Sequence, residues 1–263
     1  MADDGTKSAT DGATDDGATD DTALVIDEAE GIERVLVVTA HPDDVDFGVA
    51  GSVAVWAKAG VDISYCIVTD GDAGGSDRSV SRADMAVLRR EEQRAAAAEV
   101  GVTDVVFLGY PDGRLTPTIE LRRDISRQIR RVQPQRLVCQ SPERLWDRIG
   151  ASHPDHLAAG EAAVASVYPD ARNPFAHPEL LEEGLEPHSV AEIWLMASPR
   201  PNRAVDITDT FDMKIAALRR HRSQVGEGEW LDERLRTWAQ AGGRQAGLPA
   251  GRMAEAFQVV LTP

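Results

Sequence analysis

The sequence predicts an open, mostly parallel α/β sheet with helices on both faces, and two observations support that prediction. From residue 33 onwards, short apolar runs alternate with amphipathic stretches of helical length. Strands that alternate with helices in this way form a parallel sheet that is covered by helices on both sides. The hydrophobic share of 42% in a chain of 263 residues is ordinary for a globular protein with a sizeable core.

The individual elements follow from the apolar runs and from the turn residues between them. Strands are expected at residues 34–40, 62–70, 105–110, 136–141 and 192–198. Helices are expected at 47–60, 84–101, 118–132 and near 156–167, and the first two close at Gly60 and Gly101. Beyond residue 204 we expect a strand, a helix at 209–223 and a last helix near 228–241. This order indicates a Rossmann-like sheet.

The first 30 residues differ in composition from the rest of the chain. They hold ten acidic residues and a single lysine, Lys7, in a low-complexity run of Asp, Gly, Ala and Thr. Such a segment has too little apolar surface to offset the entropy lost on ordering. Residues 1–30 are therefore predicted to form a disordered acidic tail, and residues 33–263 to form a single domain.

Charge and hydropathy exclude several classes of function. The formal net charge is −16, of which −9 lies in residues 1–30, and an acidic body argues against binding to a nucleic-acid backbone. No apolar run approaches the roughly 20 residues that span a bilayer, and the N-terminus lacks the pattern of a signal peptide. Cys66 and Cys139 each lie in a strand-like run and are predicted to be reduced, which favours a cytoplasmic location. Whether the chain forms a homo-oligomer stays open.

A polar segment follows the first predicted strand directly. The strand 34–40 ends at His41-Pro42-Asp43-Asp44. In open α/β sheets, ligands bind in the crevice outside the carboxyl ends of the strands. A nucleotide-binding protein would carry G-x-G-x-x-G here, whereas this chain has only Gly48 and Gly51, inside the expected helix. The segment therefore predicts a ligand site of another kind.

A second segment of the same type follows the fourth predicted strand. It reads His153-Pro154-Asp155-His156, and each segment is expected to open a helix with proline at its first position. Side chains three residues apart lie on one face of a helical turn, so His153 and His156 would face the same way, as would the histidine and the second aspartate of the first segment. One such segment can be a helix cap, but two of them, which use three of the six histidines, favour a metal site.

The residue types indicate zinc. Two imidazoles and one carboxylate, with a position left open for water, form a typical catalytic zinc site. Mg²⁺ and Ca²⁺ prefer an all-oxygen shell. Zinc lowers the pKa of a bound water towards about 7, and a carboxylate beside that water can act as a general base. The residues alone leave open whether this base is Asp43 or Asp155.

Five stretches of the sequence, in this order along the chain, resemble the LmbE family, which is also called the PIG-L or GlcNAc-phosphatidylinositol de-N-acetylase superfamily. The stretches are AHPDDVDFGVAGS, TDGDAGGS, LRREEQRAAAAEVGV, YPDGRL and SHPDH. The resemblance covers residues 34–200, and MAEAF at 253–257 extends it further. One departure is Val45, where members that act on glucosaminyl-inositol or mycothiol-type substrates often have glutamate, so the resemblance does not identify the substrate.

The resemblance implies an LmbE-like fold and zinc-dependent removal of an acyl group from an amide nitrogen. It also assigns roles to matching positions. The zinc ligands would be His41, Asp44 and His156. Asp43 would be the base that deprotonates the zinc-bound water, and His153 would be a protonated imidazole that stabilises the oxyanion or protonates the leaving amine. Asp155 would then be a partner of one of the histidines.

Two more positions match the family less specifically. Asp72 ends the second predicted strand and would bind substrate, although a solvated acid in a glycine-rich turn would give the same sequence. Arg89, in the long helix 84–101, would bind sugar hydroxyls, although a surface helix with an Arg89–Glu92 pair would look the same. The other histidines, at positions 177, 188 and 221, are expected to be surface residues.

The sequence therefore predicts a zinc-dependent N-deacetylase for a small amino-sugar-type substrate, that is, an N-acetylated sugar derivative. One alternative is an amidase with the same zinc chemistry that cleaves a larger acyl or thiol conjugate. The other is a sugar- or metal-binding module without turnover, but a pure binding module has no use for the carboxylate of Asp43.

Overall fold

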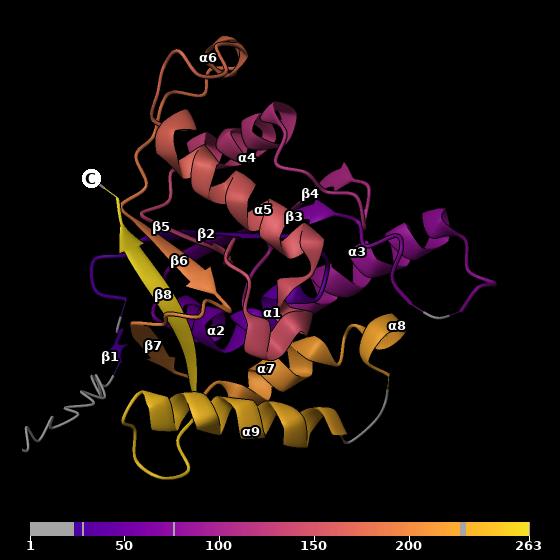
Figure 1. Ribbon diagram of the computed structural model, residues 1–263, viewed down its shortest axis with the longest axis vertical. Coiled ribbons are helices and arrows are strands. Elements are labelled where there is room, and N and C mark those ends of the chain that lie inside the picture. The colour runs from indigo at the N-terminus through magenta and orange to yellow at the C-terminus, as the bar shows by residue number, and fades with distance from the viewer. Residues whose placement is uncertain (1–23, 28, 76, 227–229, 263) are drawn as a thin grey trace, which may run out of the picture.

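An eight-stranded sheet forms the centre of the protein (Figure 1), whose computed structural model describes residues 24–27, 29–75, 77–226 and 230–262. The strand order is β1-β7-β8-β6-β5-β2-β3-β4. Neighbouring strands are parallel except for β8, which is antiparallel to both β6 and β7. The strands are β1 Val25–Ile26, β2 Arg34–Thr39, β3 Asp62–Thr69, β4 Asp104–Tyr110, β5 Arg136–Gln140, β6 Glu192–Met196, β7 Arg203–Asp206 and β8 Ala254–Leu261. The predicted mostly parallel sheet is confirmed.

Helices cover both faces of this sheet. One face packs against α4 (Ile119–Val132), α5 (Pro154–Ala165) and the turn η2 (Ser166–Asp170). The other face packs against α2 (Ala50–Lys58), α3 (Arg82–Glu99), α7 (Phe211–Leu218) and α9 (Trp230–Gln245). The short helices are α1 (Asp44–Gly48), η1 (Trp146–Ser152), α6 (Glu179–Glu182) and α8 (Arg222–Val225). None of the described helices is long and apolar enough to cross a membrane.

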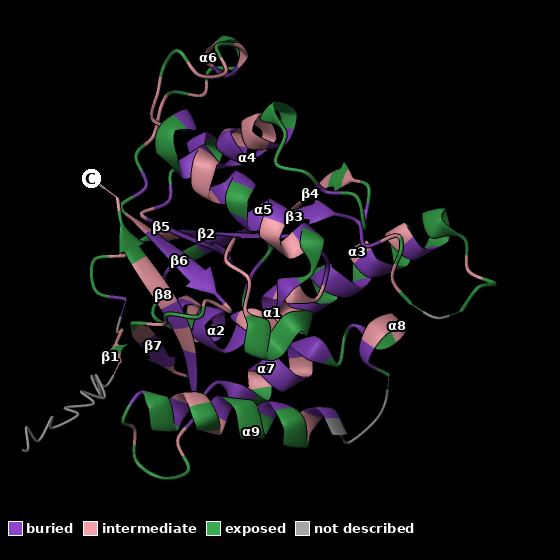
Figure 2. Ribbon diagram, in the orientation of Figure 1, coloured by how far each residue is buried: buried purple, intermediate pink, exposed green. Residues whose placement is uncertain are grey.

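Strand β2 is buried on both faces because its side chains alternate between two hydrophobic cores. Val35 and Val37 belong to the core beneath α2 and α3, whereas Leu36 and Val38 belong to the core beneath α4 and α5. A side-chain period of two produces this alternation. Figure 2 shows the resulting buried centre of the sheet. The carboxyl end of β2, where His41 follows, therefore lies between the ends of β3 and β5.

Three details differ from the sequence prediction. The expected helix 47–60 is divided into α1 and α2 at Val49, whose backbone (φ −145°, ψ 2°) is not helical. The expected helix 209–223 is likewise divided into α7 and α8. Strands β1 and β8 were not predicted: β1 has only two residues, and β8 combines a buried start with an exposed end.

The predicted boundary of the acidic tail near residue 30 is wrong. Val25 and Ile26, which lie before this boundary, pair with β7, while residues 1–23 and 28 lie outside the described part. Asp27 binds the guanidinium of Arg136 at 2.9 Å and 3.1 Å. That guanidinium is buried, stacks on Trp194 at 3.9 Å, and has Glu192 as its other carboxylate partner at 2.6 Å.

Deleting residues 1–30 is therefore expected to lower the free energy of unfolding by about 1–3 kcal/mol, the usual cost of leaving a buried polar group short of a partner. The deletion removes strand β1 and leaves Arg136 with Glu192 alone. Chemical denaturation of the shortened and intact chains measures the difference. The variant Asp27→Asn separates the ion pair from the strand, and unchanged stability of both proteins would contradict the prediction.

The two cysteines lie on opposite sides of the central strand. Val38 of β2 is paired with Cys66 of β3 on one side and with Cys139 of β5 on the other. Two strand spacings of about 4.8 Å separate such residues by roughly 9–10 Å, beyond the reach of a disulfide. Both cysteines are free in the structure, as the sequence predicted.

Both thiols are therefore expected to titrate in denatured, unreduced protein. Burial raises the pKa of the Cys66 and Cys139 thiols to about 12, so neither should react with a thiol reagent in the folded protein. Titration before and after denaturation measures the two states, and the absence of free thiol after denaturation would contradict the strand order.

Candidate active site

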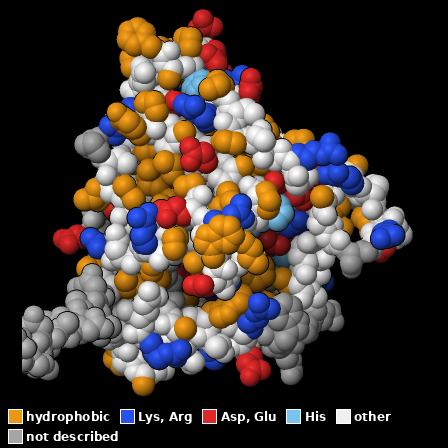
Figure 3. Space-filling view, in the orientation of Figure 1, with side chains coloured by type: hydrophobic (Ala, Val, Ile, Leu, Met, Phe, Trp, Pro, Cys, Tyr) orange, Lys and Arg blue, Asp and Glu red, His pale blue; other side chains and the backbone are white. Residues whose placement is uncertain are grey.

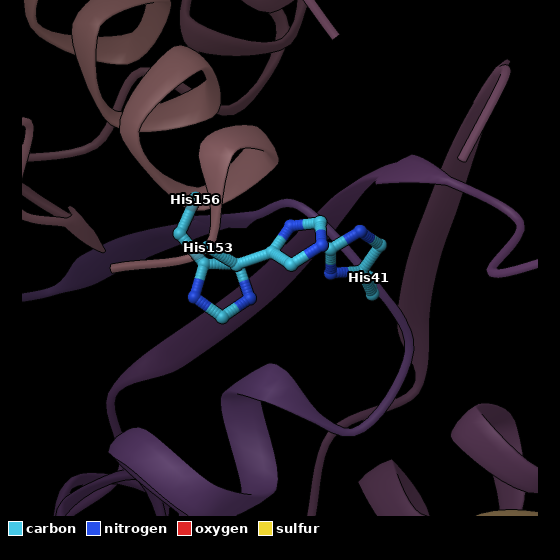
Figure 4. Close-up of side chains that lie close together, drawn as sticks. All are labelled: His41, His153 and His156. Carbon is cyan, nitrogen blue, oxygen red and sulfur yellow. The ribbon is translucent and has the colours of Figure 1, made fainter. Parts of the chain in front are cut away.

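The two His-Pro-Asp segments meet at the carboxyl edge of the sheet. His41 follows β2, and His153 and His156 stand at the start of α5, which follows β5 and η1. Figure 4 shows that the three imidazole rings gather in one place. Their ring centroids are 5.2–5.4 Å apart, and one nitrogen from each ring lies within 4.8 Å of the others. A group of this kind can hold a metal ion.

Asp44 connects two of these histidines. Its Oδ2 lies 3.3 Å from Nδ1 of His41, and its Oδ1 lies 3.0 Å from Nε2 of His156. The other ring nitrogen of His156, Nδ1, lies 3.2 Å from the carbonyl oxygen of Ala151 and donates its N–H there, so Nε2 is the nitrogen that faces Asp44. The three residues that the resemblance implied as metal ligands are thus brought together in the structure.

The two segments differ in their backbone geometry. Pro154 is the first residue of α5, as expected, and His153 caps that helix: its Nδ1 accepts a hydrogen bond from the backbone N–H of Asp155 at 3.2 Å. The expectation that Pro42 opens a helix is wrong, because α1 begins at Asp44. Asp43 precedes α1 with φ +86°, a left-handed conformation that non-glycine residues seldom adopt.

The unusual conformation of Asp43 is held from α3. Gln93 accepts a hydrogen bond from the backbone N–H of Asp43 at 2.8 Å, and Nη2 of Arg89 donates to its Oδ2 at 3.0 Å. Burial and the adjacent charge of Asp44 raise the pKa of Asp43 to about 7, although Arg89 opposes this shift. A carboxylate whose pKa lies near neutrality is well suited to accept and return a proton.

Arg89 lies inside the protein, not on its surface. Besides Asp43, its guanidinium donates to the carbonyl oxygens of Pro42 at 2.6 Å and Gly71 at 2.9 Å, and the residue is only 4% exposed. The alternative interpretation, a surface pair with Glu92, is wrong, because Glu92 accepts from the backbone and hydroxyl of Ser223. The structure places Arg89 behind the site, where it supports the backbone of the first segment; its contact with sugar hydroxyls stays a prediction.

Asp72 is tied into the loops around the site. Its Oδ2 accepts from Nε of Arg82 at 2.7 Å, and its Oδ1 accepts from the backbone N–H of Asp112 at 3.2 Å. The hydrogen bond from Arg82 is the main reason that the pKa of Asp72 is lowered. A role in substrate binding stays a prediction for this half-buried carboxylate.

Two carboxylates stand behind His41. Its Nε2 lies 3.1 Å from Oδ1 of Asp112 and 3.3 Å from Oδ2 of Asp155. Asp155 also accepts from the backbone N–H groups of Gly113 and Leu115, so it has little capacity left to act as a base. This arrangement supports Asp155 as a partner of a histidine. Sequence reasoning gave Asp112 no role, although it stands in the YPDGRL stretch after β4.

His221 is a further residue that sequence reasoning placed wrongly. It was expected at the surface, but it is fully buried, and its Nε2 lies 2.8 Å from Oδ2 of Asp46. The same Oδ2 accepts from Nε2 of Gln93, which in turn binds the backbone of Asp43. Of the other two histidines, which are half-buried, His177 lies 3.3 Å from Asp170 and His188 binds the carbonyl oxygen of Pro134.

The electrostatics of the group fit a bound cation. Burial alone would lower the pKa of His41, yet hydrogen bonds with Asp112 and Asp44 raise it to about 11. Burial would also raise the pKa of Asp44, but His156 and His41 hold it well below its usual value. Both shifts have one cause: the carboxylates at this edge require positive charge between them. A divalent ion on imidazole and carboxylate donors would supply that charge.

Comparison with known proteins agrees with this site. A family model described as PIG-L, GlcNAc-PI de-N-acetylase, matches residues 36–167, from β2 through the start of the segment after α5. The chain belongs to the PIG-L family. The match includes both His-Pro-Asp segments, so the predicted family is confirmed. Its members are metal-dependent deacetylases, which are hydrolases that act on C–N amide bonds.

Individual relatives of this PIG-L protein support the assignment along most of the chain. Diacetylchitobiose deacetylase of Thermococcus kodakarensis is 32% identical over 82% of this chain and 80% of its own length. A probable N-acetyl-alpha-D-glucosaminyl L-malate deacetylase 2 of Bacillus subtilis is 30% identical over 78% and 89%. The solved N,N'-diacetylchitobiose deacetylase from Pyrococcus horikoshii, complexed with its inhibitor MPG, superposes with a TM-score of 0.82 at 32% identity and covers 89% of this chain and 86% of its own.

Proposed function

We propose that this PIG-L protein removes the N-acetyl group from a small N-acetylated amino-sugar derivative, with one zinc ion held by His41, Asp44 and His156. The observation that carries the proposal is the position of Asp44, which contacts both histidines, beside the carboxyl group of Asp43. The names of the relatives given above support the substrate class, because each is a deacetylase of an N-acetylated sugar compound.

Zinc held by these residues would act as a Lewis acid and lower the pKa of water. The chain supplies the remaining groups. Asp43, with its pKa of about 7, accepts a proton from the attacking water and returns it to the amide nitrogen as the C–N bond breaks, so that acetate and a free amine leave. Arg89 and Gln93 hold Asp43 in place for both transfers.

Of the three histidines at the site, His153 is the exposed one. Partial burial of its ring and the charges of His41 and His156 lower its pKa, although the residue as a whole is exposed. The resemblance implies a protonated imidazole at this position, and that protonation state stays a prediction. Because Nδ1 accepts from the backbone of Asp155, the proton lies on Nε2, from which it can be donated to the carbonyl oxygen as negative charge develops there.

Metal analysis is the first test of this proposal. Purified wild-type protein is expected to contain about one zinc ion per chain, since structural precedent gives a catalytic zinc site three protein ligands and one open position. A His41→Ala/His156→Ala double variant should lose that metal. His188→Ala serves as the matched control, because His188 is a half-buried histidine that binds Pro134 outside the site. Full metal retention by the double variant would contradict the ligand assignment.

Amine release from a panel of substrates is the second test. Wild-type protein is expected to release amine from N-acetylated glucosamine derivatives, and faster than from the same sugars with longer N-acyl groups. Preference for the longer acyl groups would support the amidase alternative instead. Metal binding without amine release from any compound would support a binding module and overturn the proposed deacetylation.

A further inference from the structure

Two neighbouring cavities extend from the candidate active site towards α9. The first, of about 380 Å³, is lined by Asp44 and His156 of the site and also by Arg148, Arg234 and Trp238. The second, of about 360 Å³, lies under α9 and shares part of its wall with the first. The residues common to both cavities are Phe47, Gly48, Arg148, Met196, Ala197 and Trp238. A substrate held at Asp44 can therefore extend beyond its N-acetyl sugar into a second space.

Two guanidinium groups, those of Arg148 and Arg234, stand on the wall of the first cavity, and Arg148 also lines the second. The Cζ atoms of Arg234 and Arg148 lie 4.6 Å and 5.6 Å from the ring centroid of Trp238. Arg234 stands one turn before Trp238 on α9, whereas Arg148 comes from η1, the turn that leads to His153. In the space-filling view, basic side chains lie beside hydrophobic ones near the centre of the face, over the region of α1 and α7 (Figure 3).

The charges on this wall are not balanced by the cavity itself. The carboxylates that line the two cavities are already paired: Asp44 contacts His41 and His156, and Glu255 binds the buried Lys214. Within the described part of the chain, no carboxylate forms an ion pair with Arg148 or Arg234. By contrast, the exposed Arg219, which follows α7, does pair with Asp232 of α9 at 2.7 Å.

We propose that Arg148, Arg234 and Trp238 bind an anionic substituent of the substrate, a carboxylate or phosphate on the group attached to the amino sugar. This inference rests on the proposed deacetylation, because it places the N-acetyl group at Asp44 and His156. A guanidinium is planar and forms paired hydrogen bonds with a carboxylate or phosphate, and stacking on indole leaves its N–H edge free. The relatives include deacetylases named for a neutral sugar and for a malate conjugate, so their names do not decide this point.

Three substrates of different charge test the proposal. They are N-acetylglucosaminyl malate, N-acetylglucosamine 1-phosphate and, as the neutral compound, diacetylchitobiose. The metal-loaded wild-type protein is expected to have a higher kcat/KM for one or both anionic compounds than for the neutral one. The double variant Arg148→Gln/Arg234→Gln should lower kcat/KM for the anionic compounds about ten- to hundredfold, mainly through KM, because it removes charge-assisted hydrogen bonds. Its kcat/KM for diacetylchitobiose and its metal content should stay within about threefold of wild type.

Arg236→Gln is the matched control. Arg236 stands on the same helix and stacks on Phe211 at 4.7 Å, but it lines neither cavity. It should change no substrate selectively. A response to malate but not to phosphate, or the reverse, identifies which anion is recognised. Equal loss for neutral and anionic compounds in the double variant, or a wild-type preference for the neutral one, would overturn the proposal.

Binding separates this proposal from the deacetylation itself. Calorimetric titration of the same three compounds into metal-loaded Asp43→Asn protein, in which turnover is expected to be about 10²–10⁴-fold slower, gives dissociation constants that do not depend on catalysis. If the double variant Arg148→Gln/Arg234→Gln, combined with Asp43→Asn, binds only the anionic compounds more weakly, the subsite is supported even when wild-type protein releases no amine. The absence of amine release would refute only the proposed function. No difference in affinity between charged and neutral compounds would refute the subsite alone.

Discussion

Replacing Asp43 with asparagine is expected to lower kcat by about 10²–10⁴-fold, the usual contribution of a general base. The metal content should stay near that of wild type, because the carboxylate that contacts His41 and His156 is that of Asp44. Asparagine is the informative substitution at this position. It keeps an oxygen for the hydrogen bond from Arg89, and it tolerates the left-handed backbone (φ +86°) better than alanine does.

Amine release under saturating substrate and elemental analysis of the same preparation measure the two parts of this prediction. Asp44→Asn is the comparison variant, since it should lose the metal as well as the activity. If Asp43→Asn protein turns over within about threefold of wild type, Asp43 is not the base. Asp155 would be a poor alternative base, because its oxygens already contact His41 and accept from two backbone N–H groups. His153 would then be the next candidate for the base.

The central part of the fold could be predicted from sequence because its strands are continuous apolar runs. Residues Val35 to Thr39 are all buried. A strand that is covered on both faces has a short, near-continuous apolar sequence, which can be recognised directly. Strand β8 could not be placed in this way. It is antiparallel, its far end is exposed, and its pairing with β6 and β7 depends on contacts remote in sequence.

The candidate site could be predicted from sequence only where a segment with the same metal-binding residue types occurs twice along the chain. The two His-Pro-Asp segments predicted one metal site, and the family resemblance implied His41, Asp44 and His156 as its ligands. The structure brings these three residues together. Asp112 gave no such signal, because an aspartate before glycine is typical of an ordinary turn. Its contact with His41 arises only because the ends of β2 and β4 lie on either side of β3.

His221 shows the same limit for buried polar residues. In sequence it stands among arginines, which indicates a surface helix. In the structure α7 packs on α3 and brings this part of the chain inwards, so that His221 meets Asp46, and both side chains are fully buried. Burial would lower the pKa of His221, but the hydrogen bond and the charge of Asp46, together with the charges of Asp43 and Glu92, raise it. The pair connects the C-terminal helices to α1, and Gln93 continues the connection to Asp43.

His221→Ala is therefore expected to destabilise the fold by about 3–5 kcal/mol, the usual cost of removing one partner of a buried charged pair. For a chain of this size, that change corresponds to a fall in melting temperature of roughly 6–20 °C. The physical reason is the carboxylate of Asp46, which would stay buried with only the amide of Gln93 as a donor.

The double variant Asp46→Asn/His221→Ala should be more stable than His221→Ala alone, because it leaves no buried carboxylate without its histidine partner. His188→Ala, which loses one hydrogen bond to a backbone carbonyl in a half-buried position, should cost only about 1 kcal/mol. Calorimetric melting of wild-type protein and these three variants measures the differences. If His221→Ala has the same melting temperature as the His188→Ala control, this buried pair does not hold the C-terminal helices against the site.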